Sequence, residues 1–489
     1  MSEPIIAPRE LHGKRLLGYI IGGFGFSLTN MLSGVFVFQY YVYTINLNSL
    51  LVSIGLAIQL IIAALCSILW GVIIDNKKPG KFGKRRPYLF YGLPIWVVTS
   101  ILLWLPPWYC PKNNSMFWPT AIYFWIIIII NPIAGTSVIM AHASMFPEQS
   151  QTEENRQKIA SSGTILLIIA SILGLLVPLV VQSLLPDPEN IKWWDSSGKI
   201  VLFYIPLIGT TFAIFALFCV VITFFSVDES FHKATLEAEV EKVSISMIFH
   251  QMIIPAKDKK FRKFMAVGLF NGVSGRLVGL IIIPFLIFVL KFRGTDYFIY
   301  VFVSFTCKFG WYYFWKKISE RQALIKAFSL CIAFSVITSF LELFFLIEIL
   351  SFEFKIALFI ISYGTVLGSM YAFGLFNGPV YSALVYEAAA KIEPETENLD
   401  EAVSSISGAY TGLLTFMASV GPAIASLLLG FILMGSNQEN SEILTICLAS
   451  TGIFYLIALL YLRQIKLDKS ISEIKTISIE SKEILPPPE

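Results

Sequence analysis

The amino-acid sequence predicts an all-α integral membrane protein with twelve transmembrane helices. Its mean hydropathy is +0.72, and only 14% of its residues are charged, whereas roughly a quarter are charged in soluble domains. Aromatic residues make up 15% of the chain, with 41 Phe, which suits a surface that meets lipid tails and headgroups. Apolar runs of about 20 residues, the length that crosses a bilayer, recur along the whole chain.

Six of these runs precede a long polar stretch and six follow it. Each is a candidate helix, because about 20 residues in helical conformation span a hydrocarbon core of ~30 Å. The first six are expected at 16–43, 50–74, 88–105, 117–145, 159–184 and 201–225, and the last six at 264–292, 297–314, 327–346, 354–383, 403–434 and 443–462.

The long polar stretch, residues 226–263, predicts two six-helix halves at 16–225 and 264–462. The second part of this stretch alternates apolar and polar positions, as in a helix that lies along the inner membrane surface. Its basic residues would then face anionic headgroups. The polar tails, residues 1–15 and 463–489, complete the expected organisation.

The distribution of basic residues predicts the orientation of the chain. Most of the 36 Lys and Arg residues fall in tails and loops that share one side of the membrane when the N-terminus is cytoplasmic. Basic residues are enriched in cytoplasmic loops. We therefore expect a monomeric, multi-pass protein of the plasma membrane, surrounded by lipid, with both termini in the cytoplasm. The net charge of +3 gives no support for nucleic-acid binding.

Two of the loops on this side carry distinctive charge patterns. Residues 71–88 read GVIIDNKKPGKFGKRRPY, in which Asp75 ends one apolar run and Lys84, Arg85 and Arg86 precede the next. Residues 141–158 read AHASMFPEQSQTEENRQK, which contains Pro147-Glu148 and Arg156. Charge this dense between two spans cannot lie in hydrocarbon, so both segments are expected to be cytoplasmic loops.

Together the two motifs resemble those of the glycoside–pentoside–hexuronide cation symporters, the melibiose-permease-like branch of the major facilitators. The resemblance extends over essentially the whole chain. It implies two halves that rock around a midplane site and move a sugar, glycoside or sugar acid, coupled to Na⁺ or H⁺.

The resemblance also implies a cytoplasmic gate. In it, Asp75 would face Lys84, Arg85 or Arg86 across the helix ends, and Glu148 and Arg156 would supply opposing charges. The alternative is that these are solvated loop charges that fix only the topology, each contributing less than about 1 kcal/mol.

The sequence departs from the family at the positions that bind the cation and the sugar. Alignment on the motifs places Ser27 where the family has an acid in span one, and it places apolar or hydroxyl residues at the other charged positions. The interior thirds of the first six spans contain no Asp, Glu, Lys or Arg. A desolvated cation needs an anionic partner at membrane depth. Facilitated transport, exchange, or coupling through a different site therefore remain open.

Two cations are expected near the membrane midplane in the second half. Arg276 and Lys308 lie about 17–18 Å along their spans, at ~1.5 Å per residue. Uncompensated charges at this depth cost at least ~2.5–3.5 kcal/mol each. We hypothesise that an anionic group of the solute completes the pair, Arg276 binding it bidentately and Lys308 as a point charge. The alternative is that backbone carbonyls, Tyr hydroxyls and water satisfy both.

Further polar side chains inside the spans are candidates for a solute cavity. Sugar hydroxyls would suit them, but such residues also commonly join membrane helices by hydrogen bonds. His142 is either a proton-coupling group or a packing residue. The remaining cavity candidates are Ser27, Asn30, Asn131, Asn271, Ser274, Asn377 and Tyr381.

Enzymatic activity has no support in the sequence. There is no P-loop, nucleophile elbow or metal-ligand spacing, so no catalytic residue, cofactor or metal site is expected. Two alternatives to sugar transport remain. One is transport of lysophospholipids or other organic anions, which the long apolar spans permit. The other is a transporter-like receptor that binds a solute without moving it.

Overall fold

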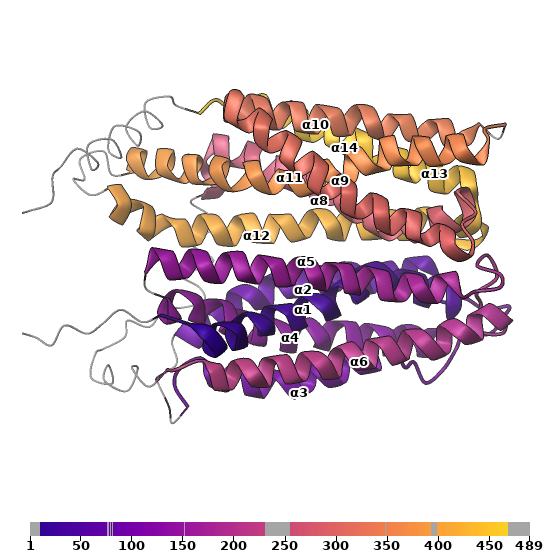
Figure 1. Cartoon of the computed structure of the whole chain (residues 1–489), viewed down its shortest axis with the longest axis horizontal. Coiled ribbons are helices and arrows are strands. Elements are labelled where there is room, and N and C mark those ends of the chain that lie inside the picture. The colour runs from indigo at the N-terminus through magenta and orange to yellow at the C-terminus, as the bar shows by residue number, and fades with distance from the viewer. Residues whose placement is uncertain are drawn as a thin grey trace, which may run out of the picture. The chain divides into compact units, whose positions relative to one another are not determined.

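The structure is a computed structural model that describes residues 10–75, 78, 80, 82–150, 152–229, 255–347, 349–392 and 399–467. Its helices follow the predicted spans closely (Figure 1). In the first half they are α1 (Gly13–Gln39) with the π-helical turn η1 (Tyr40–Thr44), α2 (Ser49–Asp75), α3 (Arg86–Leu102), α4 (Trp118–Gln149), α5 (Glu153–Ser183) and α6 (Ser196–Ser226). In the second half they are α8 (Lys259–Pro284) with the π-helical turn η3 (Phe285–Val289), η4 (Gly294–Asp296), α9 (Tyr297–Arg321), α10 (Leu324–Leu341), η5 (Glu342–Leu346), α11 (Phe352–Ile392), α12 (Leu399–Ile432), η6 (Gly435–Glu439), α13 (Ser441–Ala449) and α14 (Thr451–Leu462).

The predicted all-α membrane fold is confirmed. Within the described residues all regular structure is helical, apart from an isolated bridge between Gly80 and Gly83. Ten of the described helices are long and apolar enough to cross a membrane. The other two predicted spans correspond to α3, which has only 17 residues, and α9, which carries Lys308 near its middle.

Two helices differ from the predicted ranges. The 41-residue α11 extends beyond residue 383, because the alanine-rich segment that follows favours helix. The last span is interrupted at Ser450, whose hydroxyl donates to the Cys447 carbonyl over 2.7 Å. Such a bond competes with the regular helical ladder, and the span consists of α13 and α14.

Contacts divide the chain into two compact units. The first contains α1 to α6 together with residues 277–301 and 423–444, which are the C-terminal parts of α8 and α12 and the segments that follow them. The second contains the N-terminal parts of α8 and α12, with α9 to α11 and the chain from Thr445. The predicted division into halves at residues 226–263 remains a prediction.

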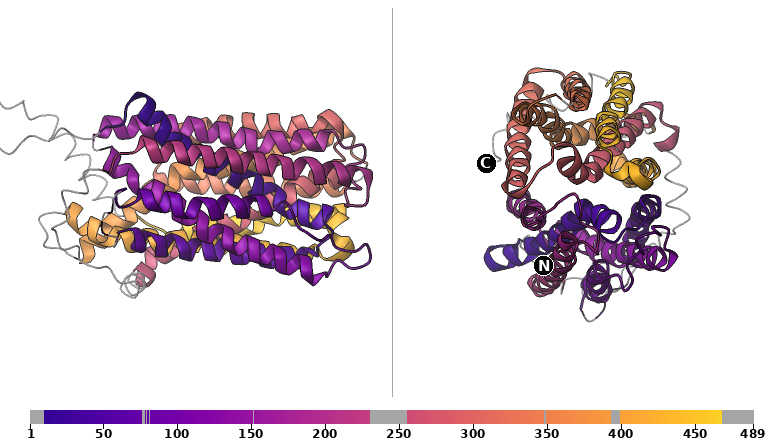
Figure 2. Two further views of the ribbon diagram at one scale, coloured as in Figure 1. Left: turned by 90° about the horizontal axis from the view of Figure 1, so that it is seen from below. Right: turned by 90° about the vertical axis from the view of Figure 1, so that its right-hand side faces the viewer.

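In the first unit α1 packs against α5 and α6, while α4 packs against α2 and α3. The bundle is seen end-on in Figure 2. The contact between α1 and α6 is close because Gly25 lies against Ala216 and Cys219, where an added Cβ would lie 3.0 Å from both. Small residues let membrane helices approach in this way.

In the second unit α10 packs against α11 and α14. The helix α11 also carries Gly364 and Gly368, one turn apart, against Cys307 and Trp311 of α9. An added Cβ at either glycine would lie within 2.7 Å of α9 atoms. This small-residue contact fixes the distance between α9 and α11.

The ends of α1 and α8 have the same unusual conformation. Each helix ends in a five-residue π-helical turn, η1 or η3, and the second residue after the turn has positive φ: 66° at Asn46 and 54° at Lys291. Equivalent backbone hydrogen bonds also follow the two turns. Leu47 N donates to Tyr41 O and Phe292 N donates to Leu286 O, both over 2.9 Å. The two segments form an internal structural repeat.

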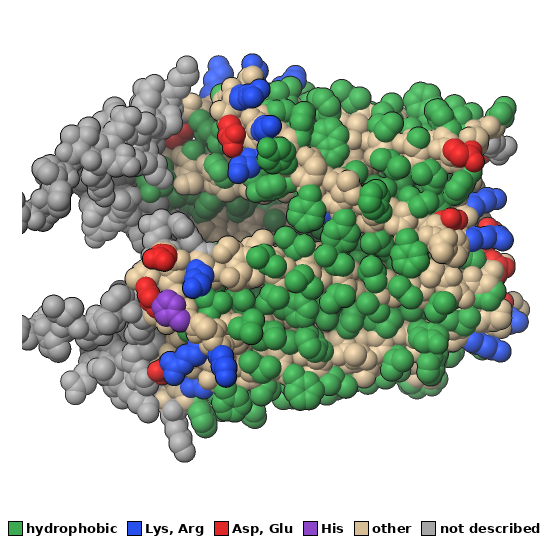
Figure 3. Space-filling model, in the orientation of Figure 1, with side chains coloured by type: hydrophobic (Ala, Val, Ile, Leu, Met, Phe, Trp, Pro, Cys, Tyr) green, Lys and Arg blue, Asp and Glu red, His purple; other side chains and the backbone are tan. Residues whose placement is uncertain are grey.

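The surface agrees with membrane insertion. On the face shown in Figure 3, hydrophobic side chains cover the sides of the helices, and charged side chains gather toward the helix ends. Exposed aromatic and aliphatic residues such as Phe203, Phe225 and Phe302 are at least 64% accessible. Contiguous exposed apolar surface on this scale is expected where lipid is the solvent.

Candidate functional site

The basic loop before α3 folds around a buried acid, Glu229, which follows α6. The Glu229 carboxylate accepts hydrogen bonds from the backbone N–H of Arg85 at 3.0 Å and of Arg86 at 3.2 Å. It therefore caps the N-terminus of α3, where backbone N–H groups lack helical partners and the helix dipole favours negative charge. Glu229 is 1% exposed.

Gly83 is required for this arrangement. Its φ is +92°, and an added Cβ would lie 2.0 Å from Glu229 Oε2. The carboxylate can reach the α3 N-terminus only because this position has no side chain. The contact with Glu229 therefore explains why the loop has glycine at position 83.

The three predicted gating cations of this loop have different environments. Arg86 donates from Nη2 to the Phe224 carbonyl at 2.6 Å and lies 4.5 Å over the Phe224 ring, a favourable cation–π geometry. Arg85 is buried and Lys84 is half-buried. Arg86 and Arg85 are therefore not isolated solvated charges, whereas for Lys84 that alternative stays open.

The other predicted gate residues cannot be placed at side-chain level. Asp75, Glu148 and Arg156 lie in α2, α4 and α5, but their side chains lie outside the described part of the structure. Their pairing remains a prediction. The acid that meets the loop, Glu229, was not identified from the sequence, because a single acid in the polar segment after span six carries no recognisable motif.

Polar bonds also join the neighbouring helix ends in the first unit. The Gln149 side chain of α4 bonds to both backbone groups of Asp228. Asn155 of α5 bonds to the backbone N–H and carbonyl of Leu11 and to the Ser150 hydroxyl. The ends of α4, α5 and α6 and the segment before α1 are therefore held together.

Glu10, in the same segment before α1, is an exposed member of this network. It accepts hydrogen bonds from Thr152 and His12, and these bonds lower the pKa of its carboxyl. The contribution to stability is present at neutral pH and is lost as the pH falls through the folded-state pKa.

Of the candidates in the first half, Asn131 and His142 are structural. Asn131 Nδ2 donates to the hydroxyls of Thr99 and Ser100 in α3 at 3.1 and 2.9 Å. His142 stacks on Tyr19, with ring centroids 4.5 Å apart, and bonds to the Tyr19 carbonyl at 3.0 Å. Both join helices, as the alternative interpretation expected. In α1, Ser27 is half-buried and Asn30 is exposed.

In the second unit, Lys308 meets an aromatic ring. Its Nζ lies 4.4 Å from the centroid of Tyr371 in α11, so the ring face offsets part of the charge. The close contact of α9 with Gly364 and Gly368 places the two side chains within reach. Tyr371 was not singled out from the sequence, because one Tyr among 20 carries no local signal.

Arg276 borders the same turn of α11. It follows Gly275 in α8, where an added Cβ would lie 2.9 Å from Met370 Cε. Met370 immediately precedes Tyr371, the partner of Lys308. The structure therefore brings α8 at Gly275, the residue before Arg276, and α9 at Lys308 to one stretch of α11, although the two cations are 32 residues apart in sequence.

The remaining candidates in the second unit have different environments. Tyr381 of α11 bonds through its hydroxyl to Thr411 Oγ1 of α12 at 2.7 Å, and Asn377, one turn away, is exposed. Asn271 of α8 differs. Both polar atoms of its amide are buried, and neither has a hydrogen-bond partner within the described residues. Buried amides without partners are rare.

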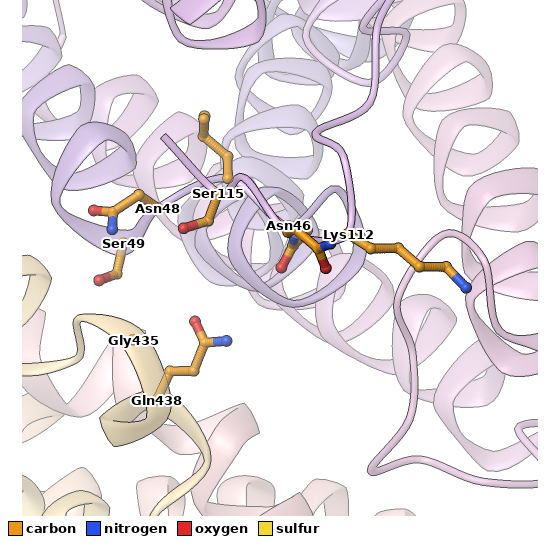
Figure 4. A pocket seen from close by; sticks show the side chains of 9 residues that line it. Asn46, Asn48, Ser49, Lys112, Ser115, Gly435 and Gln438 are labelled. Carbon is orange, nitrogen blue, oxygen red and sulfur yellow. The ribbon is translucent and has the colours of Figure 1, made fainter. Parts of the chain in front are cut away.

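A polar pocket of about 240 Å³ lies at the end of the first unit where η1 and η6 are found (Figure 4). Ser49 Oγ, on its wall, lies 2.8 Å from the carbonyls of Gly430 and Leu433. Tyr43 OH donates to the Gln438 carbonyl at 2.6 Å. The pocket was not expected from the sequence, because its residues come from three separate loops: Asn46, Leu47, Asn48, Ser49, Lys112, Asn113, Ser115, Gly435 and Gln438.

The sequence matches the model of one protein family, described as MFS/sugar transport protein, over residues 18–469. The chain belongs to this family. The resemblance to the melibiose-permease-like branch of the major facilitators is therefore confirmed, and the family consists of transporters rather than enzymes.

Curated relatives of this family member include two uncharacterized symporters. One, from Synechocystis sp., is 24% identical over 187 residues, which is 38% of this chain and 34% of that protein. YnaJ of Bacillus subtilis is 23% identical over 236 residues, 48% of this chain and 47% of that protein. The matched segments thus span less than half the length of either relative.

Solved structures of transporters share the fold of this family member. The nucleoside transporter NupG aligns with a TM-score of 0.63 at 12% identity, over 93% of this chain and 100% of that one. A D-xylose–proton symporter aligns with a TM-score of 0.51 at 12% identity, over 88% and 99%. At this identity the likeness establishes the major facilitator fold.

Proposed function

We propose that this protein is a secondary transporter that moves an anionic, sugar-like solute across the plasma membrane by alternating access. The observation that carries the proposal is the approach of α8 at Gly275, next to Arg276, and of α9 at Lys308 to one turn of α11. Membership of a sugar-transport family supports the solute class. Symporter relatives support coupling to a cation.

The two cations favour an anionic solute on energetic grounds. Charged side chains within spans are costly and mark solute or ion pathways. The Tyr371 ring offsets the Lys308 charge, but a cation–π contact contributes only about 0.5–2 kcal/mol. A carboxylate or phosphate on the solute would satisfy the ammonium more fully, and the guanidinium of Arg276 suits a planar, bidentate anion.

Polar groups of the second unit would bind the rest of the solute. Asn271 has donor and acceptor atoms without partners in the described residues, Asn377 is exposed, and Tyr381 supplies a hydroxyl group. Ser27 and Asn30 are the candidate solute-binding residues of the first unit. Sugar hydroxyls, which both donate and accept, would satisfy such a set.

The inner gate is proposed to include the loop before α3. The acids Asp75 and Glu148 would form charge pairs with cations of the gate, which are Lys84, Arg85, Arg86 and Arg156, and these pairs would break when the cytoplasmic side opens. The Glu229 cap supports this role, because it holds the backbone of the loop in one conformation. With this loop on the cytoplasmic side, both termini also lie in the cytoplasm. We further propose that the protein functions as a monomer.

The test is transport by the purified protein in liposomes. We expect sugar acids to accumulate and neutral sugars to be weak substrates, and Arg276→Gln or Lys308→Gln to reduce uptake of the acid at least tenfold, which corresponds to about 1.4 kcal/mol. The matched control is Lys317→Gln, which removes a similar cation–π contact with Tyr313, 5.0 Å away, elsewhere on α9.

Three results would contradict the proposal. Uptake of neutral sugars that is insensitive to both substitutions would show that the solute is not anionic. Movement of lysophospholipids in preference to sugars would assign a different solute class. Binding without movement of any solute would indicate a receptor.

A further inference from the structure

A polar stripe runs along one face of α10 and is completely buried. Its members are spaced three or four residues apart, which places them on one side of a helix. None is more than 1% exposed. In chain order they are Cys331, Ser335, Ser339 and Glu342.

Glu342 lies at the end of this stripe, within the span Leu324–Leu346. Both of its carboxyl oxygens are buried, and in the described part of the chain neither has a hydrogen-bond partner. The helix α14 packs against α10, and its Tyr455 hydroxyl is also buried and without a partner in the described residues. Two unsatisfied groups of complementary character therefore share one interior.

Hydrogen bonds connect the stripe to α8. Thr451 of α14 bonds through Oγ1 to the Ser339 hydroxyl at 3.2 Å. The Ser274 hydroxyl of α8 donates to the Thr451 carbonyl at 3.0 Å. Ser274 lies two residues before Arg276, so α8 contacts this interior through one face and carries Arg276 on a different face.

We propose that Glu342 is a proton-binding site through which this transporter is coupled to H⁺. This inference rests on the proposed function. In it, Glu342 takes the role of the carboxylates that the first six spans lack. The step is simple protonation: the carboxylate takes up one proton from the outer side to form the neutral carboxylic acid, and releases it to the inner side. No other bond changes.

The environment suits a proton better than a metal cation. An ionised carboxylate without partners in a dry interior costs several kcal/mol, and protonation removes that cost. A sodium ion would need several oxygen ligands, and within the described residues no polar atom lies at hydrogen-bond distance from this carboxylate.

On α10, α11 and α13 the charged side chains lie toward the helix ends. The helix α9 also packs against α10, through Trp311 and Trp315 on Phe334, and carries Lys308 near its middle. The buried titratable groups are Cys331 of α10, Tyr363 and Glu387 of α11, Cys447 of α13 and Tyr455 of α14. The charged residues of α10, α11 and α13 are in the first turn or the last two turns of their helices: Lys326 in α10, Glu353, Lys355, Glu387 and Lys391 in α11, and Glu442 in α13.

The experiment compares Glu342→Gln with wild type in liposomes. We expect the variant to lose accumulation driven by an inward pH gradient while retaining exchange of labelled for unlabelled solute at equal pH, because exchange needs no net proton movement. Glu353→Gln, which neutralises an exposed acid in the first turn of α11, is the matched control and should behave as wild type. Unchanged gradient-driven accumulation in Glu342→Gln would overturn the inference, as would accumulation driven by Na⁺ alone.

A spectroscopic readout separates this inference from the proposed function. Infrared difference spectra of the full-length protein should show a protonated-carboxyl band that is absent from Glu342→Gln and decreases as the pH rises. If no solute is moved by wild type, the proposed function fails and the band still decides the proton site. A Glu342 carboxyl band that does not change with pH would overturn the proton-site inference. Tyr455→Phe, which preserves the carboxyl, should shift the pH dependence of the band and serves if Glu342→Gln does not fold.

Discussion

Glu229 determines the conformation of the loop before α3 through two backbone hydrogen bonds and the space left by Gly83. A charged cap of this kind is stronger than a neutral one, because charge-assisted hydrogen bonds are shorter and about twice as strong. It also explains why a basic loop needs an acid from a distant part of the chain. The two segments are more than 140 residues apart.

Gly83→Ala should therefore destabilise the protein. The substitution forces an L-residue into φ +92° and places a Cβ inside the Glu229 side chain, and we expect a loss of about 2 kcal/mol or more in the free energy of unfolding. Thermal unfolding of the purified protein in detergent measures the effect.

Gly80→Ala is the matched control for this prediction. Gly80 lies in the same loop, and the nearest atom to an added Cβ is 3.9 Å away, so a change within about 0.5 kcal/mol is expected. Equal melting temperatures for both variants would show that Glu229 does not fill the space beside Gly83.

Residue-level chemistry was only partly accessible from the sequence. The cost of burying Arg276 and Lys308 could be predicted, because a charge in an apolar run is visible locally. Their neighbours Met370 and Tyr371 could not, since only helix packing brings α11 to both. Asn131 and His142 carried the right chemistry for a site, but their contacts with Thr99 and Tyr19 are structural.

Among the elements, η1 and η3 stand out because π-helical turns are rare and are found mostly at functional positions. The second residue after each turn lies in the left-handed region of backbone conformation. Gly adopts this region readily, Asn and Asp do so less readily, and other residues do so only with strain. Asn46 suits this conformation. Lys291 does not, and its helix end is accordingly strained.

Lys291→Gly should stabilise the protein. The side chain is exposed, so little packing is lost, and relief of the positive φ contributes up to about 1 kcal/mol. A rise in melting temperature is the expected result.

Asn46→Gly provides the comparison at the equivalent position. Asn46 already tolerates positive φ and donates to the Pro111 carbonyl at 3.1 Å, so no gain is expected. A higher melting temperature for Asn46→Gly than for Lys291→Gly would contradict the assignment of strain to Lys291.

Helix positions were predictable from apolar runs, whereas their endings were not. Hydropathy located all twelve spans, because membrane-spanning length and apolar composition are local properties. It could not show the π-helical turns or the break at Ser450, which depend on single backbone hydrogen bonds. It also could not show that α8 and α12 each contribute to both compact units.

For the molecule as a whole, the proposed orientation in the membrane rests on the placement of the basic residues. The test uses single cysteines and a membrane-impermeant maleimide on intact cells. Asn113→Cys, on an exposed turn between α3 and α4, should be labelled from outside. Lys158→Cys, exposed near the start of α5, should be labelled only after permeabilisation.

The native cysteines give this test a low background. Cys110, in the same outer loop as Asn113, is fully buried, and burial raises the pKa of its thiol to about 11, which keeps it in the unreactive protonated form. Labelling in the reverse pattern would invert the proposed topology, and with it the direction from which Glu342 takes up its proton.

The matching ends of α1 and α8 also bear on the history of the chain. A π-helical turn amounts to one residue inserted into an α-helix, and here it occurs at the same distance before the same left-handed residue in both places. Duplication of one segment that carried this turn would account for both. Residues 39–48 and 284–293 share no identical residue at equivalent positions, so different sequences here adopt the same backbone conformation.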